Sequence, residues 1–148
     1  MADIALTQAE ADALIAMEKR CAEDKDWLFP KPGENLVIPL ESPDKREHFL
    51  LDITRGRIKL TQATYQNRAR QAVVLKRLDL GGPPHTNPDG QELPCPHIHI
   101  YREGYGTKWA YSLPERYPVG GSLIAMFDAF LQDCNVVDPP RVQMGLFS

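Results

Sequence analysis

Apolar and polar positions follow a helical period near both ends of the chain. Thr7 and Glu10 form a capping box that opens an apolar stripe, which predicts a helix over residues 7–24. Ser122 is placed to cap a second apolar stripe, which predicts a helix over residues 122–134. Both patterns are typical of helices that pack one face on a core.

Between these helices the pattern changes to the alternation and β-branched content of strands. Five extended segments are predicted, at residues 48–54, 57–70, 71–80, 97–102 and 108–113. The first three are separated only by tight turns, which favours an antiparallel meander. We therefore expect a single α+β domain over residues 1–148, in which a roughly five-stranded antiparallel sheet is flanked by an N-terminal and a C-terminal helix.

Composition bears on loop content, on the expected cellular location and on disulfide bonding. Thirteen prolines indicate that much of the chain is loop, and residues 81–96 are predicted to form a long one. The chain lacks an apolar run long enough to span a membrane and lacks a secretory signal, so we expect a cytoplasmic protein with no membrane partner. With three cysteines, we expect no disulfide framework.

Charge is distributed unevenly along the chain. The net charge is −3, yet the segment from Ile53 to Arg77 carries seven basic residues and no acidic one. A local basic field of this kind can attract an anion even when the whole molecule is mildly acidic.

The most informative stretch is PCPHIHIYREGYGTKW, residues 94–109. In a strand alternate side chains share a face, so Ile98 and Ile100 are expected in the core. His97, His99 and Tyr101 then form a polar row on the opposite face, with successive residues about 6.6–7 Å apart. Such a row can transfer protons.

Three interpretations of this row remain open from the sequence. Zinc is one, with Cys95 or His85 completing a site at His97 and His99, although no C-x₂-C pair accompanies them. Acid–base catalysis is the second, because a histidine titrates near neutral pH and further polar groups lie close by. The third is a half-exposed sheet face whose histidines only bond to neighbours.

RNA cleavage through the 2′-hydroxyl is the leading hypothesis, because it needs a base, an acid and a cation without requiring a metal. We expect no metal ion and no cofactor. The predicted catalytic residues are His97, His99, Tyr101 and Lys108. The predicted phosphate-binding residues are Arg55, Arg57, Arg68, Arg70 and Arg102.

Residues 47–112 carry the blocks YQ-x-R, PHTNPDG and H-x-H-x-YREGY-x-x-KWA. In these blocks the chain resembles a family of small, largely uncharacterised bacterial proteins that are often encoded in mobile or prophage regions. The resemblance groups ten residues into one pattern: Tyr65, Arg68, His85, Asp89, His97, His99, Tyr101, Arg102, Lys108 and Trp109.

The mobile-element context that the resemblance implies suggests two classes of function. One is a toxin-like endoribonuclease acting on RNA. The other is a non-catalytic binder, such as an anti-defence inhibitor or an antitoxin, that uses the same face to bind nucleic acid or a protein partner from the same mobile element. The overall acidity departs from the strongly basic composition common among small ribonuclease toxins.

Overall fold

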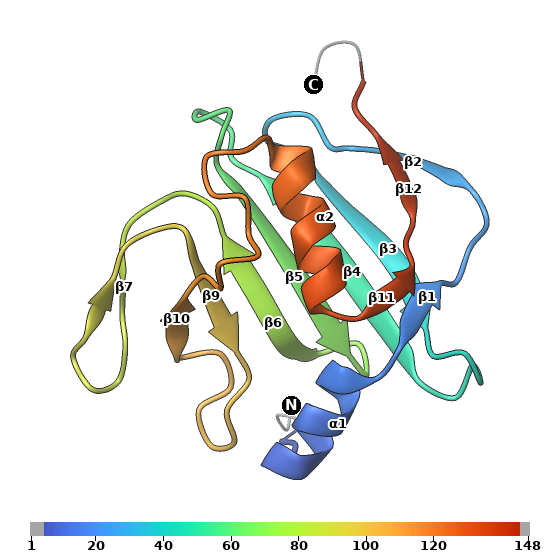
Figure 1. Cartoon of the computed structure of the whole chain (residues 1–148), viewed down its shortest axis with the longest axis horizontal. Coiled ribbons are helices and arrows are strands. Elements are labelled where there is room, and N and C mark those ends of the chain that lie inside the picture. The colour runs from blue at the N-terminus through green and yellow to red at the C-terminus, as the bar shows by residue number, and fades with distance from the viewer. Residues whose placement is uncertain (1–4, 146–148) are drawn as a thin grey trace.

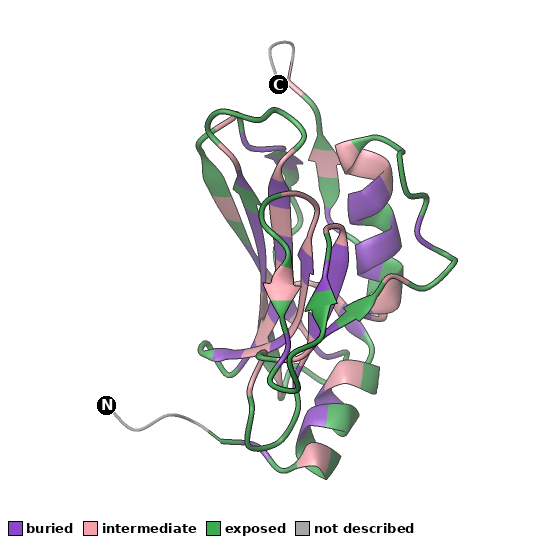
Figure 2. Cartoon of the chain, turned by 90° about the vertical axis from the view of Figure 1, so that its left-hand side faces the viewer, coloured by how far each residue is buried: buried purple, intermediate pink, exposed green. Residues whose placement is uncertain are grey.

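The computed structural model describes residues 5–145 and has an eight-stranded sheet as its centre (Figure 1). Helix α2 lies across one face of this sheet, and helix α1 lies on the same side near one end (Figures 1 and 2). Within residues 5–145 the opposite face carries no helix. The α+β class expected from the sequence is therefore confirmed.

The elements have the following bounds. The helices are α1 (Gln8–Ala16) and α2 (Leu123–Asp133). The strands of the main sheet are β1 (Lys19–Cys21), β3 (Asn35–Glu41), β4 (His48–Arg55), β5 (Ala63–Ala69), β6 (Val73–Asp79), β9 (His97–Ile100), β10 (Ala110–Ser112) and β11 (Val136–Asp138). Two small sheets pair β2 (Asp26–Leu28) with β12 (Arg141–Gln143), and β7 (His85–Thr86) with β8 (Glu92–Leu93).

The strand order of the main sheet is β10-β9-β6-β5-β4-β3-β1-β11. The predicted meander is confirmed, because β4, β5 and β6 are antiparallel neighbours. The strand count of five was too low. The three additional strands are β1, β3 and β11. Strands β1 and β11 have three residues each and pair in parallel across the whole chain, so neither shows an alternation that the sequence could reveal.

Both predicted helix starts are confirmed. Thr7 and Glu10 form the capping box of α1, and the Ser122 side chain accepts a hydrogen bond from the Ala125 amide. Helix α1 ends at Ala16 rather than near residue 24, because the next residues pair with β3 as strand β1. Neither helix in residues 5–145 is long and apolar enough to cross a membrane.

Buried positions recur at every second residue along much of β3, β5 and β6, which separates a core face of the sheet from an open face. In β5, Ala63, Tyr65, Asn67 and Ala69 are buried, while the three residues between them are half-buried. The buried set faces α2, whose Phe127 and Phe130 pack against the Tyr65 ring. The open face is left for polar side chains, and it holds the candidate site.

Lys19 fixes the ends of both helices to the sheet. Its fully buried ammonium donates to the carbonyls of Ile15, Met17 and Cys134, at 2.8–3.0 Å. These carbonyls lie at or near the C-termini of α1 and α2, where orphan acceptors need donors. Burial lowers the pKa of Lys19 from 10.5 to about 8.

This pKa predicts a dependence of stability on pH. Between about pH 8 and 10.5 the unfolded chain holds the Lys19 proton while the folded chain loses it. The contribution of Lys19 to the free energy of unfolding therefore rises with pH. Relative to Lys19→Met, the wild type should gain about 2 kcal/mol of unfolding free energy between pH 7 and pH 9.5. Urea unfolding at both pH values measures this gain, and a constant difference between the two proteins would contradict the burial argument.

A histidine–carboxylate cluster as candidate functional site

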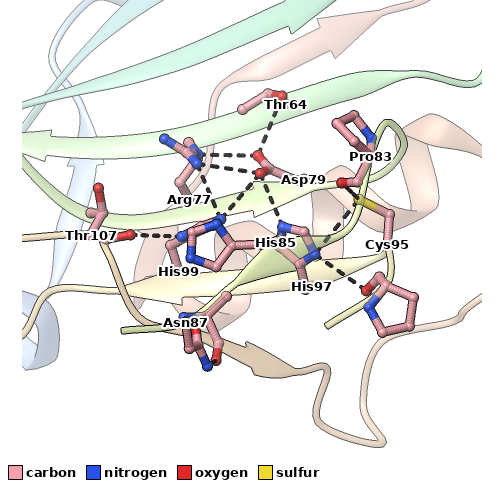
Figure 3. Close-up of polar contacts among 12 residues, drawn as sticks. Thr64, Arg77, Asp79, Pro83, His85, Asn87, Cys95, His97, His99 and Thr107 are labelled. Atoms are coloured by element: carbon pink, nitrogen blue, oxygen red, sulfur yellow. Dashed lines mark hydrogen bonds and ion pairs between the residues drawn. The ribbon is translucent and has the colours of Figure 1, made fainter. Parts of the chain in front are cut away.

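The two histidines of β9 meet a carboxylate from the neighbouring strand β6. In the register of these strands His97 lies opposite Asp79 and His99 lies opposite Arg77. The Nε2 atoms of His97 and His99 each lie 3.2 Å from Asp79 Oδ2 (Figure 3). The prediction that both histidines share the open face is therefore confirmed, and both isoleucines between and after them pack toward the core.

The outer nitrogen of each imidazole is held by the backbone. His99 Nδ1 lies 2.7 Å from the Thr107 carbonyl, and His97 Nδ1 lies 3.2 Å from the Pro94 carbonyl. A carbonyl oxygen only accepts, so each Nδ1 carries a proton. Both rings are thereby oriented with Nε2 toward Asp79. Each histidine is about 1% exposed.

Arg77 completes the group that we call the Asp79 cluster: Arg77, Asp79, His97 and His99. Its guanidinium donates to both carboxylate oxygens, at 3.1 and 3.4 Å, and its Nη2 lies 3.1 Å from His99 Nε2. Burial alone would raise the pKa of Asp79, but the hydrogen bond from His99 and the charge and hydrogen bonds of Arg77 outweigh it and lower the pKa to about 2. Asp79 is therefore ionised at neutral pH.

The two rings differ in whether their partners accept or donate hydrogen bonds. His97 has an acceptor at each nitrogen, the Pro94 carbonyl and the Asp79 carboxylate, so an imidazolium satisfies both contacts. His99 Nε2 has a donor in Arg77 and an acceptor in Asp79, so it has a partner whether it carries a proton or not. Such an arrangement is suited to proton transfer.

An open cleft of about 450 Å³ adjoins the cluster. Arg77, Asp79 and His97 form part of its wall. The rest of the wall comes from polar side chains at β4 and β5 and from the proline-rich loop over residues 81–96. His85 from that loop lies against the His99 ring at a centroid distance of 4.6 Å, and its Nε2 bonds to the Lys108 carbonyl. The loop therefore packs over His99, while the cleft leaves an approach to Asp79 and His97.

The zinc set suggested by C-x-H-x-H does not assemble around one point. Cys95 Sγ lies 3.6 Å from His97 Nδ1, on the side of the ring away from Asp79. Burial raises the pKa of the Cys95 thiol, which disfavours the thiolate. The third atom that converges with the two Nε2 atoms is Asp79 Oδ2, and among the described residues this trio is the group that could hold a metal ion.

Tyr101 and Lys108 were predicted beside the histidines, and the structure separates them from the cluster. Strand β9 ends at Ile100, and the buried Tyr101 hydroxyl bonds to the amide and carbonyl of Leu6. The shared face predicted for Tyr101 is wrong, because alternation stops where the strand stops. Lys108 has an exposed side chain, and its carbonyl is the group that contacts the site.

Two of the predicted phosphate-binding arginines lie away from the cleft. Arg55 is only 5% exposed on the core face and donates to the carbonyls of Pro30 and Leu60. Its predicted role is corrected, because a guanidinium held in this way supports the β4–β5 connection. Arg57 lies exposed in that connection, outside the cleft lining.

Arg68 and Arg70 are paired with carboxylates. Arg68 makes a two-pronged bond to Asp52, at 2.7 and 2.8 Å, on the open face. Arg70, in the β5–β6 turn, contacts Glu47 and Glu10. The sequence segment without acids is thus neutralised by acids from other segments, which an inspection of the segment alone could not show.

Arg102 stacks its guanidinium over the Trp109 ring, 4.4 Å from the centroid, and lies near Tyr105. It is not among the residues that line the cleft. The cation beside the histidines is instead Arg77, which sequence reasoning had placed only in the basic segment. The one available signal was that Arg77 and Asp79 alternate on β6, as His97 and His99 do on β9.

Comparisons with known proteins add one finding. No curated protein and no solved structure matches the chain. A family described as a family of unknown function (DUF6978) matches residues 6–136, which cover most of the chain and include the whole Asp79 cluster. The protein therefore belongs to this family of unknown function.

Proposed function

We propose that the Asp79 cluster is the reacting centre of a metal-independent, toxin-like endoribonuclease. The observation that carries this proposal is the convergence of two oriented imidazoles and a guanidinium on one ionised carboxylate beside a cleft. RNA cleavage needs an acid, a base and a cation at one phosphate, and these three groups are supplied by adjacent residues of two paired strands.

The reaction assigns one role to each group. His99 takes the proton of the 2′-hydroxyl, whose oxygen then forms a bond to phosphorus. The bond from phosphorus to the 5′-oxygen breaks, and the His97 imidazolium gives its proton to that oxygen. The products are a 2′,3′-cyclic phosphate and a 5′-hydroxyl. Arg77 stabilises the charge on the phosphorane, and Asp79 positions all three side chains.

Arg77 and the polar wall of the cleft are the groups that would contact the RNA. The Arg77 side chain is 32% exposed, so its guanidinium can reach a phosphate while it stays near Asp79. Thr54, Gln62 and Thr64 offer further hydrogen bonds along the same wall. Because Arg68 and Arg70 are paired, we expect a short contact with RNA rather than a long basic track.

Cleavage of RNA by purified protein in the presence of a chelator tests this proposal. The double variant His97→Gln and His99→Gln should lower the rate by at least about 10²–10⁴-fold, since that is the usual contribution of positioned proton donors and acceptors. The same variant should also remove any growth inhibition that the wild type causes on expression.

Arg70→Gln provides the matched control, because Arg70 is a charged residue of the same basic segment that lies in a turn away from the cleft. Its rate should stay within about threefold of the wild type. A double histidine variant that folds and keeps full biological effect would contradict catalysis. It would favour the alternative, a mobile-element protein that acts by binding nucleic acid or another protein.

A further inference from the structure

We propose that Asp79, His97 and His99 also bind Zn²⁺ or a similar divalent transition-metal ion, and that the bound ion inhibits the site. The binding part of this inference stands on geometry alone. The inhibitory part rests on the proposed ribonuclease function.

The three ligand atoms have the separations that a small cation needs. His97 Nε2 and His99 Nε2 are each 3.2 Å from Asp79 Oδ2, and all three atoms lie within 4.8 Å of one another. Zinc bonds of about 2.0–2.1 Å at a tetrahedral angle place neighbouring ligands about 3.3 Å apart. One ion can therefore bind all three atoms after small movements.

The surroundings of the histidines are those of metal ligands. A ligating histidine commonly donates its other ring N–H to a carbonyl or carboxylate, which fixes the tautomer and the direction of the lone pair. Here the Thr107 and Pro94 carbonyls hold both Nδ1 atoms, so both Nε2 atoms are directed inward. Two neutral imidazoles and one carboxylate suit zinc among the biological divalent cations.

Arg77 is the competitor of the ion. Its Nη2 lies 3.1 Å from His99 Nε2 and 3.4 Å from Asp79 Oδ2, so it bonds to two of the three ligand atoms. A metal ion must displace this guanidinium and repel its charge. Because the side chain is 32% exposed, Arg77 can turn into the cleft when the ion enters.

Metal binding and proton transfer exclude each other at this site. An ion held by both Nε2 atoms occupies the lone pairs that would receive or hold protons. It also moves Arg77 away from its position beside the carboxylate. The ion-bound protein should therefore lose the acid, the base and the placed cation together.

Binding is tested by titrating Zn²⁺ into chelator-treated, desalted wild-type protein in a calorimeter, and by the visible absorption of Co²⁺ at the same site. Asp79→Asn and His97→Gln should each weaken the affinity by at least about 100-fold. Arg77→Ala should strengthen it by about fivefold or more, because a like charge a few ångströms away is removed. This gain in affinity cannot arise from misfolding.

Two controls separate this site from its neighbours. Asp52→Asn removes a comparable carboxylate from the same face, and Cys95→Ser removes the nearest thiol; both should leave the affinity within about threefold. A wild type that binds Zn²⁺ no more tightly than Asp79→Asn would overturn the metal site. Dependence of the affinity on Cys95 would overturn the proposed ligand set.

RNA cleavage measured with and without Zn²⁺ tests the inhibitory part. Stoichiometric Zn²⁺ should abolish cleavage by the wild type, and chelator should restore it. Cleavage that appears only with Zn²⁺ would overturn inhibition and the metal-independent function together, while leaving the binding site intact. Cleavage in chelator by a protein that does not bind Zn²⁺ would overturn the metal inference and leave the proposed function standing.

Discussion

Asp79→Asn is expected to lower RNA cleavage by about 10²–10⁴-fold while the fold is retained. The carboxylate receives contacts from His97, His99 and Arg77, and an asparagine keeps its shape but loses its charge and one acceptor. The His97 imidazolium then lacks its counter-ion, and Arg77 loses the group that places it. Cleavage of a defined RNA substrate measures the loss of rate. A circular dichroism spectrum checks that the fold is retained.

Asp52→Asn is the matched control for this experiment. Asp52 lies on the same face and also holds an arginine in a two-pronged bond, and its carboxylate also accepts a hydrogen bond from Gln66 rather than from a histidine. Its loss should cost about 1–2 kcal/mol of unfolding free energy, because the pair is largely shielded from solvent, and should leave the cleavage rate within about threefold. Equal losses of rate in both variants would indicate that the Asp79 effect is structural.

Tyr65→Ala is expected to produce the largest loss of stability, about 3–5 kcal/mol of unfolding free energy. Tyr65 is fully buried between sheet and helix, where its ring packs on Phe29, Phe127 and Phe130. Its hydroxyl donates to the Leu123 carbonyl in the first turn of α2, at 2.7 Å. Truncation leaves a cavity beneath α2 and breaks this bond, which denaturant unfolding should report.

Two further substitutions define the source of the Tyr65 effect. Tyr65→Phe removes only the hydroxyl, so it should cost about 1 kcal/mol and leave RNA cleavage unchanged. Tyr111→Ala changes a tyrosine that is 38% exposed on β10 and should cost less than about 1 kcal/mol. Loss of cleavage by a stable Tyr65→Phe protein would contradict this separation, because Tyr65 lies on the core face, away from the cleft.

The local features of the fold could be predicted from the residues that form them. Thr7 and Ser122 begin helices because their side chains satisfy free amides within three residues, so no distant partner is needed. The alternation of His97 to Ile100 assigned its two faces correctly, because the side-chain period of a strand is a local property. It also placed Cys95 in the loop before the strand.

The partners of the two histidines depend on strand pairing in the folded chain. The β6–β9 register brings Asp79 opposite His97 across a gap of 17 intervening residues, and the side-chain period does not specify which residues will be opposite. For the same reason the free positive charge of the basic segment was overestimated. Asp52 of β4 pairs with Arg68, and Glu47, which precedes β4, pairs with Arg70. Tyr101 left the row because β9 ends one residue earlier, where the chain turns toward Leu6.

Local features could be predicted and the site could not because the two depend on contacts of different range along the chain. Capping, alternation and turns depend on neighbours a few residues away, and the residue types printed in the sequence are enough to predict them. A site made of one carboxylate, one guanidinium and two imidazoles depends on strand pairing, which only the folded chain fixes. The sequence therefore supplied the two histidines, and the sheet supplied the Asp79 and Arg77 that give them a chemical role.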